Sequence, residues 1–209
     1  PPGSGRTFSA RSLAQRVAAS RRTPDDLLLL PNPSRPSEPA ARNMPAGKGR
    51  AFVEEMSDLY RRLVEGIRGA TEGERFKQAQ SKSRRRARSE ETKLEQKLKA
   101  DAAELGLDLT RTGEEVEVTS ITEGEEPSSE AVESVTIAIE EFEAKLADVH
   151  EEAEVELRAI VKQLLADAVK SCFSPVGARY RDRADIVEFL RELEEEITSR
   201  VKQLVDEPR

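Results

Sequence analysis

The residues best suited to chemistry stand at the start of the chain, in the run Gly3-Ser4-Gly5-Arg6-Thr7. In the phosphate-binding pattern G-x-x-x-x-G-K-[ST], Gly5 takes the second glycine, Thr7 the hydroxyl residue and Arg6 the place of lysine. Small residues let backbone N–H groups turn toward phosphate oxygens at a helix N-terminus, and a threonine hydroxyl at this place can hold Mg²⁺. These five residues therefore predict a site for ATP, with Thr7 reaching the Mg²⁺ that the nucleotide carries.

Two features of this run depart from the full pattern. Arg6 keeps the positive charge but not the compact ammonium of lysine, so its placement on the β- and γ-phosphates is in question. The first glycine, and the β-strand that leads into such a loop, would fall before Pro1, which indicates a piece of something longer. A flexible Pro/Gly/Ser turn or cloning scar is the competing interpretation.

The elements that follow fit a phosphate-binding unit. Residues 9–22 have the pattern of an amphipathic helix, and the apolar run 26–30 before Pro31 fits a buried strand of a parallel sheet. Loop, helix and strand in this order suggest a βαβ unit that lacks its first strand, although a leucine-rich turn of helix also fits 26–30. Residues 31–48 hold five prolines and are expected to form an extended surface connector.

A second group of elements is helical. The segment Pro45 to Arg50 has glycines, but their spacing matches no nucleotide motif, so we interpret it as a turn into a helix over 50–68. The apolar residues of that helix are expected to be core contacts, not a cofactor site. They are Phe52, Met56, Leu59, Tyr60, Leu63, Val64 and Ile67.

Two longer segments predict an antiparallel helical arm. Residues 128–173 run without an internal Pro or Gly, and their apolar residues recur in steps of three and four. Residues 74–105 carry a weaker seam of the same kind, and an alternating pattern over 107–121 predicts a β-hairpin between the two. The Ser174-Pro175-Val176-Gly177 run is expected to end the long helix, and a last helix is expected over 183–205.

The predicted fold class is therefore mainly α. It is a long antiparallel coiled-coil arm with a small β-hairpin at its tip, attached to a partial P-loop α/β unit. The expected domains are a partial P-loop unit with its connector (1–45), a helix at the base of the arm (46–70), the coiled-coil insertion (71–173) and a returning C-terminal helix (174–209).

Composition limits the function classes. A net charge of -7 argues against broad nucleic-acid binding, although residues 82–88 form one strongly basic run, interpreted as a solvated helix face or a contact for a polyanion or partner. The chain has one cysteine, Cys172, and one histidine, His150, which excludes an internal disulfide and argues against zinc. We interpret both as structural or surface residues. With no long apolar run and no signal peptide, the sequence predicts a soluble, cytoplasmic protein without membrane contact.

The order of these parts resembles the N-terminal part of the ATPase region of Lon-like proteases. The resemblance rests on PPGSGRT, PDDLLLLPNPSRP, MPAGKGRAF, the predicted coiled coil with its hairpin, and RADIVEFLRELEEEI. It implies an ATP-dependent AAA+ serine protease that assembles into a ring, usually a hexamer, and acts on unfolded or damaged polypeptides. It also implies a Ser-Lys dyad in a C-terminal peptidase domain. No such domain is recognisable here, so no catalytic residue is assigned and the chain is expected to be inactive alone.

Two other functions compete with this one. A stand-alone coiled-coil scaffold or adaptor, without nucleotide or protease activity, would tolerate loss of residues 1–45 with unchanged stability. A nucleic-acid clamp acting through residues 84–88 would show salt-dependent binding.

Overall fold

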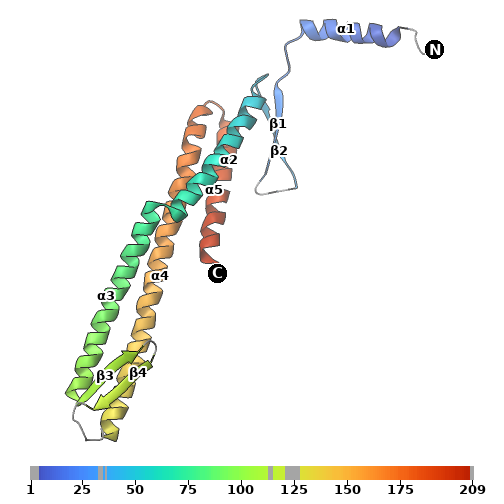
Figure 1. Cartoon of the computed structure of the whole chain (residues 1–209). Coiled ribbons are helices and arrows are strands. Elements are labelled where there is room, and N and C mark those ends of the chain that lie inside the picture. The colour runs from blue at the N-terminus through green and yellow to red at the C-terminus, as the bar shows by residue number, and fades with distance from the viewer. Residues whose placement is uncertain (1–4, 33–34, 36, 113–114, 121–127, 208–209) are drawn as a thin grey trace. The chain divides into compact units, whose positions relative to one another are not determined.

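The computed structural model of the chain describes residues 5–32, 35, 37–112, 115–120 and 128–207. Within these residues the fold is mainly α, as predicted, with two small antiparallel sheets. Its elements in chain order (Figure 1) are α1 (Arg6–Ser20), β1 (Asp26–Leu30), β2 (Ala40–Met44), α2 (Gly49–Glu72), α3 (Glu74–Glu104), β3 (Leu107–Thr112), β4 (Glu115–Ser120), α4 (Ser129–Arg179) and α5 (Ala184–Asp206). The chain divides into two compact units, residues 1–67 with 166–201 (unit 1) and residues 68–165 with 202–209 (unit 2).

Unit 1 has one apolar core, which side chains of β1, β2, α2, α4 and α5 share. The helices contribute apolar residues at helical spacing, so each covers one side of the core. Phe52 of α2 is 1% exposed and meets Tyr180 edge to face, with ring centroids 5.4 Å apart. The buried members are Leu28, Leu30, Met44, Phe52, Leu59, Leu63, Val169, Cys172, Phe173, Val176, Ile186, Phe189 and Leu190.

A carboxylate holds the start of α2. The backbone N–H of Gly49 donates to Asp26 Oδ2 at 2.7 Å, across 23 residues of sequence. Gly47 turns the chain into the helix with a φ of 78°, and a Cβ at Gly49 would lie 3.0 Å from the Cβ of Asp26. The turn that the sequence predicts at this place is confirmed, and the aspartate supplies one of the partners that the first turn of a helix needs.

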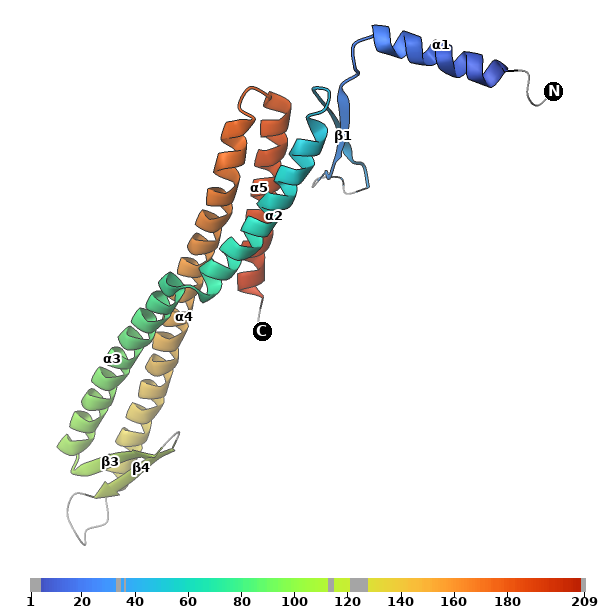
Figure 2. The same cartoon turned by 45° about the horizontal axis from the view of Figure 1, so that its top comes forward.

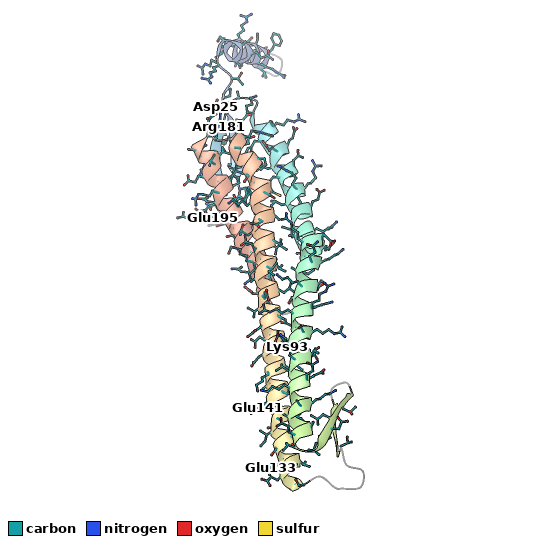
Figure 3. All side chains as sticks on the ribbon, turned by 90° about the vertical axis from the view of Figure 1, so that its left-hand side faces the viewer. Asp25, Lys93, Glu133, Glu141, Arg181 and Glu195 are labelled. Atoms are coloured by element: carbon teal, nitrogen blue, oxygen red, sulfur yellow. The ribbon has the colours of Figure 1, made fainter. Side chains whose placement is uncertain are left out.

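Replacing Asp26 with alanine is expected to lower the free energy of unfolding by about 1 to 2 kcal/mol, because the N–H of Gly49 loses its carboxylate partner. The matched control is Asp25→Ala, since Asp25, labelled in Figure 3, is exposed and precedes Asp26. Urea unfolding of the two variants measures the difference. Equal stability of the two variants would contradict a capping role for Asp26.

Three side chains join the end of α4 to α2. Glu55, whose side chain is 10% exposed, pairs with Arg179 at 2.5 Å and accepts a hydrogen bond from the Tyr180 hydroxyl. Burial, and then the bond to the Glu55 carboxylate, raises the pKa of Tyr180 from 10.0 to about 12.

This raised pKa predicts alkaline destabilisation. Because the phenol holds its proton more tightly in the folded chain, its contribution to stability is complete below pH 10.0 and is lost as the pH rises through about 12. Tyr180→Phe is expected to flatten the fall in unfolding free energy over this window. Tyr60→Phe is the control, because Tyr60 is 68% exposed. Phenolate absorbance during a pH titration checks the assignment, and a titration step at about pH 12 that persists in Tyr180→Phe would refute it.

Unit 2 is built on an antiparallel pair of helices, α3 and residues 129–165 of α4, called the helical pair below (Figure 2). Leu98 and Ala102 of α3 share an apolar cluster with Val135 and Phe142 of α4. Leu107 and Leu109 of β3 complete that cluster, and β3 pairs with β4 in the register Leu109↔Val118. The predicted hairpin is therefore confirmed as β3 and β4, while residues 113, 114 and 121 lie outside the described residues.

The middle of the helical pair has small and polar residues at its seam. Ser83 of α3 is buried, and its hydroxyl donates to the carbonyl of Ala153 at 3.0 Å. Ala87 is half-buried one turn further along α3. Burial of apolar area contributes little at this place, so the interhelical hydrogen bond replaces part of the contact that larger side chains would make.

The end of the long helix differs from the predicted one. The long helix does not end at Ser174, because α4 continues through Pro175 to Arg179. A proline inside a helix costs about 3 kcal/mol, but Phe173 and Val176, which flank it, are 2% and 1% exposed in the core of unit 1. Their burial offsets the lost backbone hydrogen bond.

The predicted parallel strand and its connector also need correction. β1 pairs antiparallel with β2, in the register Leu28↔Arg42, so the stretch 31–48 is not wholly an extended connector. An antiparallel partner needs only a short connection, whereas a parallel one needs a crossover. The strand is also not wholly buried: Leu28 and Leu30 are buried, while Leu27 and Leu29 are 64% and 67% exposed.

Candidate functional site

The predicted nucleotide residues stand at the start of α1. The structure describes Gly5, Arg6 and Thr7 of the five, and Gly3 and Ser4 lie outside the described residues. Gly5 precedes the helix with a φ of 68°, its carbonyl accepts the N–H of Ser9 at 2.8 Å, and a Cβ placed on it would meet nothing within 4 Å. Arg6 and Thr7 are exposed residues of the first helical turn.

The electrostatics of this helix start favour an anion. Among the residues that the structure describes, no side chain caps the N-terminus of α1, and its first turn carries no acidic residue. The first N–H groups of a helix and its dipole attract negative charge when no acidic side chain competes for them. This helix start therefore favours negative charge, and Thr7 belongs to its first turn.

The rest of α1 is exposed except at Ser12, which is half-buried. The helix predicted over 9–22 is observed over Arg6–Ser20, and it has no buried residue. Phe8, Leu13 and Val17 are 79%, 64% and 41% exposed. The predicted apolar side of this helix thus has no cover within the described residues.

Unit 1 also carries an apolar groove with a volume of about 780 Å³. The exposed side chains of Leu27 and Leu29 form one wall, and Val53, Met56 and Tyr60 of α2 belong to another. The lining of the groove is mostly apolar, and Arg61 is the one charged residue in it.

The basic run of α3 is exposed, which fits both interpretations of it, a solvated helix face and a contact for a polyanion or partner. Lys82, Arg84, Arg85, Arg86 and Arg88 are all exposed. Arg86 reaches across the helical pair to Glu156 at 3.0 Å, with both side chains open to solvent. An exposed ion pair of this kind contributes little to stability.

The environments of His150 and Cys172 fit the structural or surface roles that the sequence predicts for them. His150 is exposed on the helical pair, and the Cys172 thiol is buried in the core of unit 1 with its Sγ 3.5 Å from the carbonyl oxygen of Arg62. Within the described part of the chain, no group of three or more His, Cys, Asp or Glu side chains could hold a metal ion. No described helix combines the length and apolar character needed to cross a membrane.

Sequence reasoning missed one polar junction of unit 1. Arg183 donates to the Asn43 carbonyl of β2 and pairs with Asp185 at 3.0 Å in the first turn of α5. The hydrogen bond from Arg183 holds the pKa of Asp185 below its usual range. Arg183 and Asn43 are 140 residues apart, so no local pattern could have revealed the contact.

Comparison with known proteins finds a local similarity. An archaeal Lon protease from Archaeoglobus fulgidus is 40% identical to the chain over 53 residues, which are 25% of this chain and 8% of that protein. No protein-family model matches the chain. The chain thus has a Lon-like relationship over that short stretch, and the matched stretch spans less than a tenth of the relative.

Proposed function

We propose that this chain is part of a Lon-like ATP-dependent serine protease of the AAA+ type. The observation that carries the proposal is the 40% identity to an archaeal Lon protease over 53 residues. The order of a start with the phosphate-binding sequence pattern, an apolar strand and a long helical hairpin supports it. In this proposal the whole protein is cytoplasmic, assembles into a hexameric ring and degrades unfolded or damaged polypeptides with a Ser-Lys dyad outside this chain.

The proposed role of residues 3–7 is to hold the phosphates of ATP. Backbone N–H groups at the start of α1 would receive phosphate oxygens, and the Arg6 guanidinium would neutralise their charge. The Thr7 hydroxyl would contact the Mg²⁺. The left-handed conformation of Gly5 supports this role, because a side chain at this place would strain the turn that presents the N–H groups.

The proposed role of the predicted insertion, residues 71–173, is mechanical. An antiparallel pair of helices with a hairpin at one end suits a coiled-coil arm that engages or gates a polypeptide substrate. This chain contributes the phosphate loop and the arm, and it has no peptidase activity of its own.

Calorimetric titration with ATP and Mg²⁺ tests the loop residue by residue. Thr7→Ala is expected to weaken binding at least about tenfold through loss of a metal contact, and Gly5→Ala through strain in the turn. Arg6→Lys is expected to keep binding or to tighten it. Ser9→Ala is the matched control, since its hydroxyl has no part in the proposed site.

The variants also separate the proposal from the scaffold alternative. Equal affinity of Thr7→Ala and Ser9→Ala would show that any binding occurs elsewhere on the chain. A scaffold without nucleotide binding would give no saturable heat with any variant.

A further inference from the structure

We propose that the basic face of α3 binds the acidic face of α4 in a second copy of this chain. This contact is heterologous: each copy offers a basic face to one neighbour and an acidic face to the other. The inference deepens the assembly part of the proposed function, since it names the surface through which neighbouring copies would meet. It requires neither ATP nor a peptidase.

The basic face consists of exposed cations on one side of α3. Residues 77–88 include six basic residues and no acidic residue. Lys77, Arg84, Arg85 and Arg88 line one shallow hollow of about 240 Å³ together with Gln80 and Ser81. Within the described part of the chain, none of these four cations forms an ion pair. Their charge is therefore available to a partner.

The acidic face belongs to α4. Residues 140–156 include eight acidic residues and one basic residue. Asp148, Glu151 and Glu152 are exposed around a groove of about 760 Å³, and Val155, 55% exposed, adds apolar surface beside them. None of these three carboxylates pairs with a cation among the described residues. A further carboxylate of this helix, Glu141, labelled in Figure 3, pairs with Lys145 at 3.0 Å.

Charge complementarity points to a second copy as the occupant. The cations stand on α3 and the carboxylates on α4 of the same helical pair, so within one copy most of them are left unpaired across the seam. Arg86 and Glu156 pair there, which shows the kind of contact that the remaining charges could make between copies. Guanidinium groups bind carboxylates through two parallel hydrogen bonds, which favours a defined register over diffuse attraction. A head-to-tail contact of this kind propagates into a ring or a filament.

Sedimentation of the full chain at several concentrations measures the association. It is expected to be strongest at about 0.03 M salt and to weaken at about 0.5 M, because screening shortens the reach of exposed charges. Arg84→Glu with Arg88→Glu, or Glu151→Lys with Glu152→Lys, should each weaken association at least about tenfold by making the two faces repel. The matched control is Lys97→Glu with Lys99→Glu, which changes the same number of exposed charges elsewhere on α3.

Mixing the two charge-reversed chains provides the decisive arm of the experiment. In an equimolar mixture every α3 face can meet an α4 face of opposite charge, so association should return to the strength of the parent chain although each variant alone associates weakly. Failure of the mixture to associate, a monomeric parent chain at low salt, or an equal effect of the control pair would overturn the proposal. Salt-dependent binding of an oligonucleotide to the basic face without self-association would also overturn it.

Thr7→Ala keeps this test separate from the nucleotide site. That variant should lose Mg-ATP affinity and keep the association pattern, so failure of one proposal is visible without failure of the other.

Discussion

A chain that lacks residues 1–45 is expected not to fold unit 1, whereas a chain that lacks only residues 1–20 is expected to keep its stability. The longer deletion removes Leu28, Leu30 and Met44, which are 7%, 6% and 3% exposed in the core. Each such side chain contributes about 1.5 to 3 kcal/mol, so the summed loss approaches the whole stability of a small domain. The shorter deletion removes α1 alone, which has no buried residue.

The two tyrosines of the chain make this prediction simple to measure. Tyr60 and Tyr180 both belong to unit 1, and the chain has no tryptophan, so near-ultraviolet circular dichroism of tyrosine reports on unit 1. We expect the tyrosine signal to be lost on deletion of 1–45 and kept on deletion of 1–20. Unchanged stability after the longer deletion is the result that a stand-alone coiled-coil scaffold predicts, and it would refute the packing of β1 and β2 described above.

The second large effect is expected at Phe52. Phe52→Ala should lower the free energy of unfolding of unit 1 by about 3 to 5 kcal/mol, because it empties a buried site and removes the edge-to-face contact with Tyr180. Val53→Ala is the matched control: Val53 follows Phe52 on α2, is 57% exposed and should change stability by about 0.5 kcal/mol or less. Urea unfolding monitored through the tyrosine signal measures both variants. Similar losses for the two would mean that α2 presents a different face to the core.

Much of unit 2 follows from sequence periodicity. Apolar side chains recur at helical spacing within residues 74–105 and 128–173. From Leu107 on, apolar and polar residues alternate instead, which marks the hairpin. These signals are local, since each depends on which face of one element is apolar. Local signals therefore predict where the helices and strands lie in the sequence, but they do not predict which elements pack against one another.

The errors arise where contacts distant in sequence decide the structure. Residues 174–177 have the composition of a helix end, yet burial of Phe173 and Val176 keeps α4 helical through Pro175. The stretch Ala40–Met44 has little strand propensity, and it is a strand because β1 lies beside it. The hydrogen bonds of Asp26 with Gly49, and of Arg183 with Asn43, cannot be inferred from either residue's neighbours.

The candidate functional residues also include some that a local sequence pattern predicts and some that only the structure reveals. The glycine, arginine and threonine at the start of the chain follow a local motif, and in the structure Gly5, Arg6 and Thr7 stand at the start of α1. The opposed charges of α3 and α4 become visible only when the two helices are seen as a pair, because each charged run alone resembles an ordinary solvated helix face.

Titration of the unmodified chain with ATP, in the presence and absence of Mg²⁺, tests the central proposal most directly. A Lon-like phosphate loop predicts saturable binding with one nucleotide per chain, weakened when Mg²⁺ is removed because Thr7 then loses its metal contact. Heats that stay flat up to millimolar ATP with Mg²⁺ present would contradict the account.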